Sequence, residues 1–270
     1  MTAKPTRTPA VAGLFYPDDP DTLRKMVADM TPTKEPQEAL AIMAPHAGYV
    51  YSGGVAGATF AEVEIPQTVL ILSPKHTRMG AYTSINTQGH WEIPGSQVSI
   101  DELLANHLLE YLPQVVEDDA AHAKEHGVEV LLPFLQHRRP DVKFVPIVFS
   151  YRSLEHCKAM GKALGEALDQ WAEPVLIIIS SDMNHFEDEE TTQHKDHQAL
   201  QELLALQPEN LHQTCLEQNI SMCGVVPATI ALYALQPFGC TQARLVEHTT
   251  SAAVSGNTQR VVGYAGVVFS

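Results

Sequence analysis

The sequence of 270 residues contains no run of about 18 apolar residues, so it predicts no transmembrane helix. The opening stretch MTAKPTRTPAVAGLFYP lacks the apolar core of a secretory signal, and we expect a cytoplasmic protein. Basic residues are few: 17 Lys and Arg stand against 32 Asp and Glu, which gives a formal net charge of −15. This deficit argues against a broad basic face, so we expect no nucleic-acid partner and no membrane partner.

Cysteines are also few, and none of the four belongs to a C-x-x-C pair, which excludes a zinc ribbon and a thioredoxin motif. With no export signal, we expect reduced thiols, so a functional cysteine would act singly as ligand or nucleophile. The sequence has no G-x-G-x-x-G after a strand, no G-x-x-x-x-G-K-[ST] and no G-x-S-x-G. Nucleotide phosphate binding and α/β-hydrolase chemistry are therefore not supported by motifs.

Continuous apolar runs alternate with amphipathic segments along the chain. Continuous runs are typical of strands covered on both faces, and they predict strands at 39–44, 68–73, 142–149, 175–180 and 261–269. The intervening segments predict helices at 21–30, 100–111, 154–171, 192–205, 208–218 and 227–235. The alternation predicts a single α/β domain over residues 1–270, with three layers and a mixed, largely buried sheet flanked by helices. We expect residues 1–10 to be flexible.

What the sequence does have is histidine: 13 residues in all. Two of them follow a predicted strand and a proline, His46 in IMAPHAG and His76 in VLILSPKH. If the two strands are parallel neighbours, both imidazoles lie at the same edge of the sheet. Imidazole is the commonest protein ligand of transition metals, so the pair indicates a metal site. For His46 alone, a loop histidine beside a turn is the alternative.

A third predicted strand continues into SSDMNHF, residues 180–186. Asp182 and His185, three residues apart at a strand exit, can ligate a metal or form a carboxylate-oriented base. They can also orient another metal ligand through a hydrogen bond. The alternative is a capping motif, in which Ser181 or Asp182 caps the next helix.

Two further candidates have weaker support from the residues alone. His126 lies beside Glu125 and Glu129 in EHGVE and can orient a substrate or a base, or it can be structural. Cys223 precedes a predicted helix, whose N-terminus would lower the pKa of the thiol; a small buried residue is the alternative. We expect the following histidines at the surface: His90, His107, His137, His156, His194, His197, His212 and His248.

The motifs together resemble the Memo family, which is protein B of the AmmeMemoRadiSam system. The matching segments follow one another in order along nearly the whole chain. They are AGLFYP at 12–17, PHAGYVYSG at 45–53, SPKH at 73–76, EHGVEVLLPFL at 125–135, SSDMNHF at 180–186, MCG at 222–224 and VVGYAGVVF at 261–269.

The resemblance implies a fold similar to the catalytic subunit of class III extradiol ring-cleaving dioxygenases, which hold non-haem Fe(II) with two histidines and a glutamate. Memo-like proteins have a similar cleft with two histidines and a cysteine, and the resemblance therefore implies that the metal ligands are His46, His76 and Cys223. It also implies that the catalytic residues in the same cleft are Asp182, His185 and His126.

The sequence departs from the family pattern at two positions. The usual E-H-S segment ends in Gly127, so we expect a cleft hydroxyl to be missing. Asn257 stands in SGN, where the family has S-G-D. Neither departure touches the implied metal ligands.

These observations support three hypotheses. The first is a metal-dependent oxidoreductase, with iron as the favoured metal, then copper, and zinc less so. The second is a metal-binding carrier or a peptide-binding adaptor without turnover, and the third is a metallohydrolase. We expect a small molecule or peptide in the cleft. The family's system name adds a functional association with radical-SAM and AMMECR-like proteins.

Overall fold

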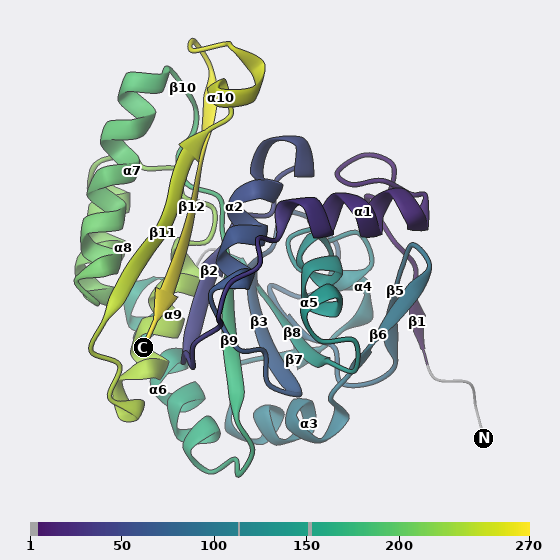
Figure 1. The fold of residues 1–270 in the computed structure, drawn as a ribbon. Coiled ribbons are helices and arrows are strands. Elements are labelled where there is room, and N and C mark those ends of the chain that lie inside the picture. The colour runs from purple at the N-terminus through teal and green to yellow at the C-terminus, as the bar shows by residue number, and fades with distance from the viewer. Residues whose placement is uncertain (1–4, 113, 151–152) are drawn as a thin grey trace.

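The computed structural model describes residues 5–112, 114–150 and 153–270. Within these residues, one sheet contains twelve strands (Figure 1). They are β1 (Thr6–Arg7), β2 (Ala41–Ala44), β3 (Thr68–Pro74), β4 (Thr83–Ile85), β5 (His90–Ile93), β6 (Ser96–Ile100), β7 (Val116–Glu117), β8 (Lys143–Phe149), β9 (Val175–Ser180), β10 (His185–Glu187), β11 (Ala243–Thr250) and β12 (Val261–Phe269). The main path runs β1-β5-β6-β8-β3-β9-β2-β12-β10, while β11 pairs with β12, and β4 pairs with β7 and β8.

Helices cover both faces of this sheet (Figure 1). One face carries α1 (Pro20–Met30), α2 (Tyr49–Ala61) and α5 (Leu132–Arg138), which contact one another. The other carries α3 (Glu102–Tyr111), α6 (Leu154–Asp169), α7 (Glu189–Leu204), α8 (Pro208–Glu217) and α9 (Val225–Leu235). Short helices complete the described chain: α4 (Asp119–His122), α10 (Ala252–Ser255), η1 (Glu129–Leu131) and η2 (Gln236–Phe238). The predicted single α/β domain with a mixed sheet between helices is confirmed.

The centre of the sheet is parallel. β9 lies between β2 and β3 and runs parallel to both, with Ala44 opposite Ser180 and Leu72 opposite Ile179. β12 is antiparallel to β2, which makes the sheet mixed. This register brings the carboxyl ends of β2, β9 and β3 to one edge, where ligand sites form in such sheets.

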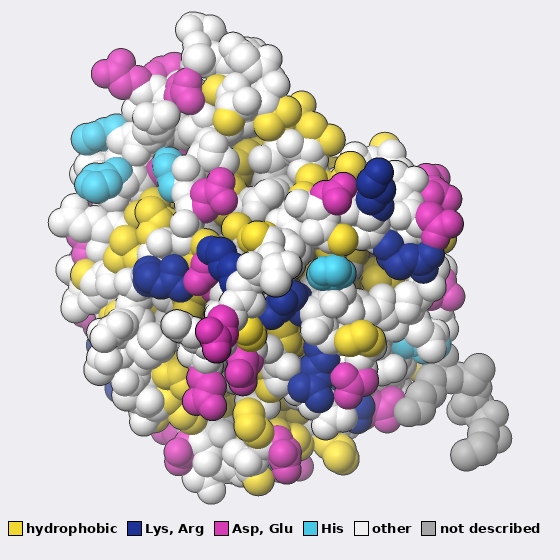
Figure 2. All heavy atoms as spheres, in the orientation of Figure 1, with side chains coloured by type: hydrophobic (Ala, Val, Ile, Leu, Met, Phe, Trp, Pro, Cys, Tyr) yellow, Lys and Arg dark blue, Asp and Glu magenta, His cyan; other side chains and the backbone are white. Residues whose placement is uncertain are grey.

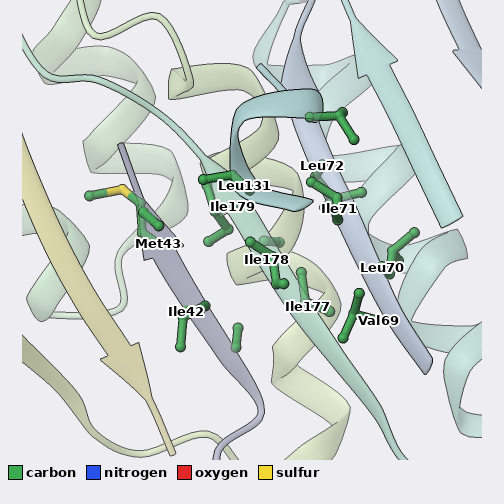
Figure 3. Close-up of a cluster of buried hydrophobic side chains, with 14 of the residues drawn as sticks. Ile42, Met43, Val69, Leu70, Ile71, Leu72, Leu131, Ile177, Ile178 and Ile179 are labelled. Atoms are coloured by element: carbon green, nitrogen blue, oxygen red, sulfur yellow. The ribbon is translucent and has the colours of Figure 1, made fainter. Parts of the chain in front are cut away.

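The three strands owe their central place to their continuous apolar sequences. Side chains on both faces are fully covered by helices, and Figure 3 shows them packed together with Leu131. Burial of one such side chain contributes roughly 1.5–3 kcal/mol. The core residues of these strands include Ile42, Met43, Val69, Leu70, Ile71, Leu72, Ile177, Ile178 and Ile179.

All five predicted strands and six predicted helices are present, with differences at their ends. α3 begins at Glu102 instead of residue 100 because Ile100 is the last residue of β6 and pairs with Phe144 of β8. The carboxylate of Asp101 then accepts the N–H of Leu104 and caps the helix. Of the residues expected to be flexible, 1–4 lie outside the described part, and Thr6–Arg7 pairs with β5.

The helix α2 was not predicted. Its sequence YVYSGGVAGATFA contains three glycines, each of which disfavours a helix by about 1 kcal/mol relative to alanine. It also has no polar face, and most of its residues are buried. Tertiary packing against the sheet therefore stabilises a helix that local propensity disfavours.

Within the described residues, no helix is both long and apolar enough to cross a membrane. Figure 2 shows basic side chains lying among acidic ones on the face it presents.

Candidate metal centre

The shared edge of β2, β9 and β3 carries the predicted site residues. His46 follows β2, His76 follows β3, and the intervening β9 continues into Asp182. The two histidine-bearing strands are thus separated by β9 instead of being direct neighbours. Their imidazole rings still come together, with centroids 5.0 Å apart.

Cys223 reaches the same place just before α9. Gly224, the N-cap residue, makes this approach possible, because a Cβ on it would lie only 2.3 Å from Cβ of Ser181. The N–H of Gly224 instead donates to Ser181 Oγ at 3.0 Å. Cys223 Sγ lies 3.3 Å from His46 Nε2, and donor atoms of His46, His76 and Cys223 all lie within 4.8 Å of one another.

This spacing fits one metal ion. Ligand distances of about 2.0–2.1 Å to nitrogen and about 2.3 Å to sulfur, in a tetrahedral arrangement, separate the two donor atoms by about 3.6 Å. The separation of Nε2 of His46 and Sγ of Cys223 is 3.3 Å. The donor set of two imidazoles and one thiol is also chemically suited to iron, copper or zinc.

The tautomer of His46 follows from its hydrogen bonds. Ser180 Oγ donates its single proton to the carbonyl of Gly127 at 2.5 Å, so the 2.7 Å contact with His46 must be donated by Nδ1–H. Nε2 then carries the lone pair and faces Cys223. Burial, together with neighbouring histidines, lowers the pKa of His46 well below its usual value, and the ring is neutral as a ligand requires.

His76 also makes its hydrogen bond through Nδ1, but to a carboxylate. Its Nδ1 lies 2.7 Å from a carboxylate oxygen of the fully buried Glu125. Burial alone would raise the pKa of Glu125, but the hydrogen bond and charge of His76 outweigh it and hold the value at about 2. The carboxylate is therefore ionised and accepts the Nδ1 proton, which leaves Nε2 of His76 free to bind a metal.

A second group of potential ligands shares His76: donor atoms of His76, Glu125 and His126 also lie within 4.8 Å of one another. Glu125, however, already accepts the backbone N–H groups of His76, Thr77, His126 and Gly127. These bonds, with that from the His76 ring, occupy both carboxylate oxygens. Glu125 is thus a support for His76 and the loop around it.

His126 lies against both histidines, its ring centroid 4.3 Å from that of His76 and 5.5 Å from that of His46. The ring of Phe15 covers it at 4.9 Å. Burial and the charge of His76 lower the pKa of His126 to about 4, so it is a neutral imidazole at physiological pH. The neighbouring Glu129 points elsewhere and bonds with the N-terminal segment.

Gly127, where the family has a serine hydroxyl, lies next to the hydroxyl of Ser73. A Cβ at this position would be 2.3 Å from Ser73 Oγ and 3.5 Å from His46 Nδ1. Ser73, at the end of β3, therefore occupies the space that a side chain at 127 would need. A side chain larger than hydrogen at position 127 would therefore require Ser73 to move.

Asp182 and Cys223 are joined by a hydrogen bond. Asp182 Oδ1 accepts the N–H of His46 at 2.8 Å, and its own N–H donates to Cys223 Sγ at 3.2 Å. Burial raises the pKa of Asp182 to about 7. Burial and the charge of Asp182 also raise the pKa of the Cys223 thiol, so the expected lowering by the helix N-terminus is wrong for the metal-free protein. A bound metal would displace the thiol proton.

His185 lies farther out, on β10, and is not in either group of close donor atoms. Its N–H donates to Ser221 Oγ and its Nδ1 to the carbonyl of Ser221, both within 2.9 Å, which leaves Nε2 as an acceptor. Burial lowers its pKa. The capping alternative for this segment is only partly realised: Ser181 binds the start of α9, while Asp188 caps the next helix, α7.

Sequence reasoning missed two supports of the centre, Ser180 behind His46 and Glu125 behind His76. A buried serine at a strand end and a glutamate beside a histidine gave no separate signal. One surface prediction was also wrong: His212 is 5% exposed on α8. His248, half-buried, contacts the buried carboxylate of Asp196 at 2.8 Å.

Comparisons with known proteins agree with this architecture. Residues 7–268 match the family described as Memo-like protein. A MEMO1 family protein of Aquifex aeolicus is 39% identical over 97% of this chain and 98% of its own length, and one of Methanopyrus kandleri is 36% identical with the same coverage. A solved structure of an uncharacterized protein from Escherichia coli K12 has a similar fold, with a TM-score of 0.53, 16% identity and coverage of 83% and 98%. The chain therefore belongs to the Memo family.

Proposed function

We propose that this chain is a non-haem iron oxidoreductase that binds the metal through His46, His76 and Cys223. The observation that carries the proposal is the convergence of these three donor groups within 4.8 Å, at a strand edge where each imidazole makes its hydrogen bond through Nδ1 and leaves Nε2 for a metal. Three protein ligands leave positions for O2 and a substrate. The iron, when bound, would supply a redox-active Lewis acid.

Side chains around the three ligands can handle protons. With a pKa of about 7, Asp182 can hold or release a proton near neutral pH. His126 and His185 are neutral rings that can accept one, because burial lowers the pKa of each. We propose Asp182, His185 and His126 as the catalytic residues and a small molecule as the substrate. The association with radical-SAM and AMMECR-like proteins stays a prediction.

A second candidate is a metal carrier or peptide-binding adaptor without turnover. The observation that favours it is the thiol of Cys223 beside His46 Nε2, because sulfur with imidazole is a donor pair suited to copper. A thiolate next to O2 is also exposed to oxidation, which a carrier avoids. A metallohydrolase, in which a metal-bound water would attack the substrate, is the third candidate.

The test is oxygen consumption by the iron-loaded protein with a panel of catechols and thiols. We expect consumption above that of free iron for at least one substrate, and loss of it in Cys223→Ala. Cys240→Ala is the matched control, because Cys240 lies beyond η2, at the opposite end of the sheet. No consumption with any substrate, in a protein that retains its iron, would favour the carrier; hydrolysis of an ester by the zinc form would favour the hydrolase.

A further inference from the structure

The N-terminal strap, which we define as residues 7–16, has been described so far only through the contact of Phe15 with His126. Its residues 12–16 belong to the segment AGLFYP, one of the motifs that resemble the family. The strap leaves β1 and passes over the segment 122–129, which carries Glu125 and His126. Its contacts with that segment are dense and largely buried.

Arg7 makes the first of these contacts. Its guanidinium donates to the carbonyl oxygens of His122 at 2.9 Å and Glu125 at 2.6 Å, and to the carboxylate of Glu129 at 2.6 Å. It also lies over the ring of Trp91, 4.1 Å from its centroid. These three hydrogen bonds hold the segment 122–129 at three points along its length. The forked guanidinium of arginine can make them together, whereas the single ammonium group of a lysine cannot.

Glu129, on the segment 122–129, binds the strap at several points; we call its ion pair with Arg7 the clamp. Its carboxylate, with no exposed surface, accepts the N–H groups of Ala10 and Val11 and the hydroxyl of Tyr16, in addition to Arg7. One buried charge pair therefore joins both ends of the strap to the segment. Such a pair is costly to break, because the remaining charge is left buried without a partner.

The far end of the strap touches the centre itself. The carbonyl of Phe15 accepts the N–H of Tyr49 at 2.8 Å, just after the His46 loop, and the ring of Phe15 packs on His126. The strap thus contacts the loop that carries His46 and the segment that carries Glu125, the support of His76.

We propose that the Arg7–Glu129 ion pair is a positioning device that orients Glu125 and His126 toward His76, and so sets the metal affinity of the centre. The inference rests on the proposed metal-binding function. Arg7 acts through the carbonyl of the residue whose carboxylate holds His76 Nδ1. A clamp that only stabilised the fold would leave the centre unchanged in every variant that still folds.

The test compares Arg7→Lys, which keeps the charge but loses the fork, with two controls. Arg24→Lys changes an exposed arginine on α1, and Leu164→Ala removes buried side-chain volume on α6 without touching the strap. Two readouts are measured: Co2+ affinity with the cobalt absorption spectrum, and the imidazole 15N signals of His76 in the metal-free protein, assigned with His76→Gln. Tyr16→Phe, which removes one bond to Glu129, repeats the test if Arg7→Lys does not fold.

We expect Arg7→Lys to lower Co2+ affinity about 10-fold to 100-fold, as loss of a ligand's support does, and to shift His76 Nδ1 away from a fully protonated signal. Both controls should retain the wild-type affinity and signal, even where Leu164→Ala lowers the melting temperature. Wild-type behaviour of Arg7→Lys, or an equal effect in Leu164→Ala, would overturn the proposal. If the wild type itself binds no Co2+, the proposed function fails, and the His76 signals still decide whether the clamp positions the ring.

Discussion

His46 and His76 occupy equivalent positions after two parallel strands, yet the protein holds them by different means. His46 is 1% exposed, and a neutral hydroxyl, Ser180 Oγ, accepts its Nδ1 proton. The side chain of His76 is 30% exposed, and an ionised carboxylate holds it. Packing on every side already restrains a buried ring, whereas a partly exposed ring needs a stronger bond. Charge-assisted hydrogen bonds are roughly twice as strong as neutral ones.

The difference also concerns charge. Glu125 brings a negative charge next to the metal-facing residues, and four backbone N–H groups satisfy it in a buried place. That charge holds Nδ1 of His76 and favours a cation bound nearby. Ser180 adds orientation to His46 without charge. Loss of Glu125 should therefore lower metal affinity more than loss of Ser180, and mutation of each residue can measure this difference.

The largest effect is expected from Glu125→Gln. It removes the charge and places an amide NH2 among N–H donors, so metal affinity should fall about 100-fold and the free energy of unfolding by about 3 kcal/mol. Competition with a chelator and urea unfolding measure the two quantities. A wild-type affinity in this variant would show that His76 needs no carboxylate.

A smaller effect is expected from Ser180→Ala. The ring of His46 stays packed, but its Nδ1–H and the carbonyl of Gly127 lose their shared partner. Metal affinity should fall about 10-fold, with about 1–2 kcal/mol lost from the free energy of unfolding. The Ser180→Thr variant keeps a hydroxyl at this position and serves as the control. An effect larger than that of Glu125→Gln would reverse the comparison.

The smallest effect on the metal is expected from Gly127→Ala. The new methyl group would press on Ser73 Oγ, so unfolding should become easier by about 1–3 kcal/mol. The double variant with Ser73→Gly should recover most of this loss, because it empties the same space. Thermal unfolding of the single and double variants checks the prediction, and additive losses would contradict it.

Much of the fold could be predicted because its signal is local. Continuous apolar runs such as 175–180 form strands that helices cover on both faces, and a histidine after such a run lies at the strand edge. The helix α2 escaped prediction because packing, not propensity, stabilises it. The support of His46 by Ser180 joins residues 134 apart in sequence, and that of His76 by Glu125 joins residues 49 apart. No local pattern predicts such pairs.

Cys223 illustrates the limit most clearly. Its neighbours Met222 and Gly224 gave no chemical signal, and only resemblance to the family connected it with the histidines. The structure supplies the physical reason for its place, since Gly224 lets the chain approach Ser181 closely. The clamp of Arg7 and Glu129 could not be predicted either, because it joins residues 122 apart in the sequence.

The central claim, that His46, His76 and Cys223 hold a metal, is tested most directly by the metal content of anaerobically purified protein. We expect iron or copper in the wild type and in Cys240→Ala. We expect His46→Ala and Cys223→Ala to lose the metal while still showing the thermal unfolding transition of a folded protein. Metal-free wild type that cannot be reconstituted, or variants that keep their full metal content, would contradict the claim.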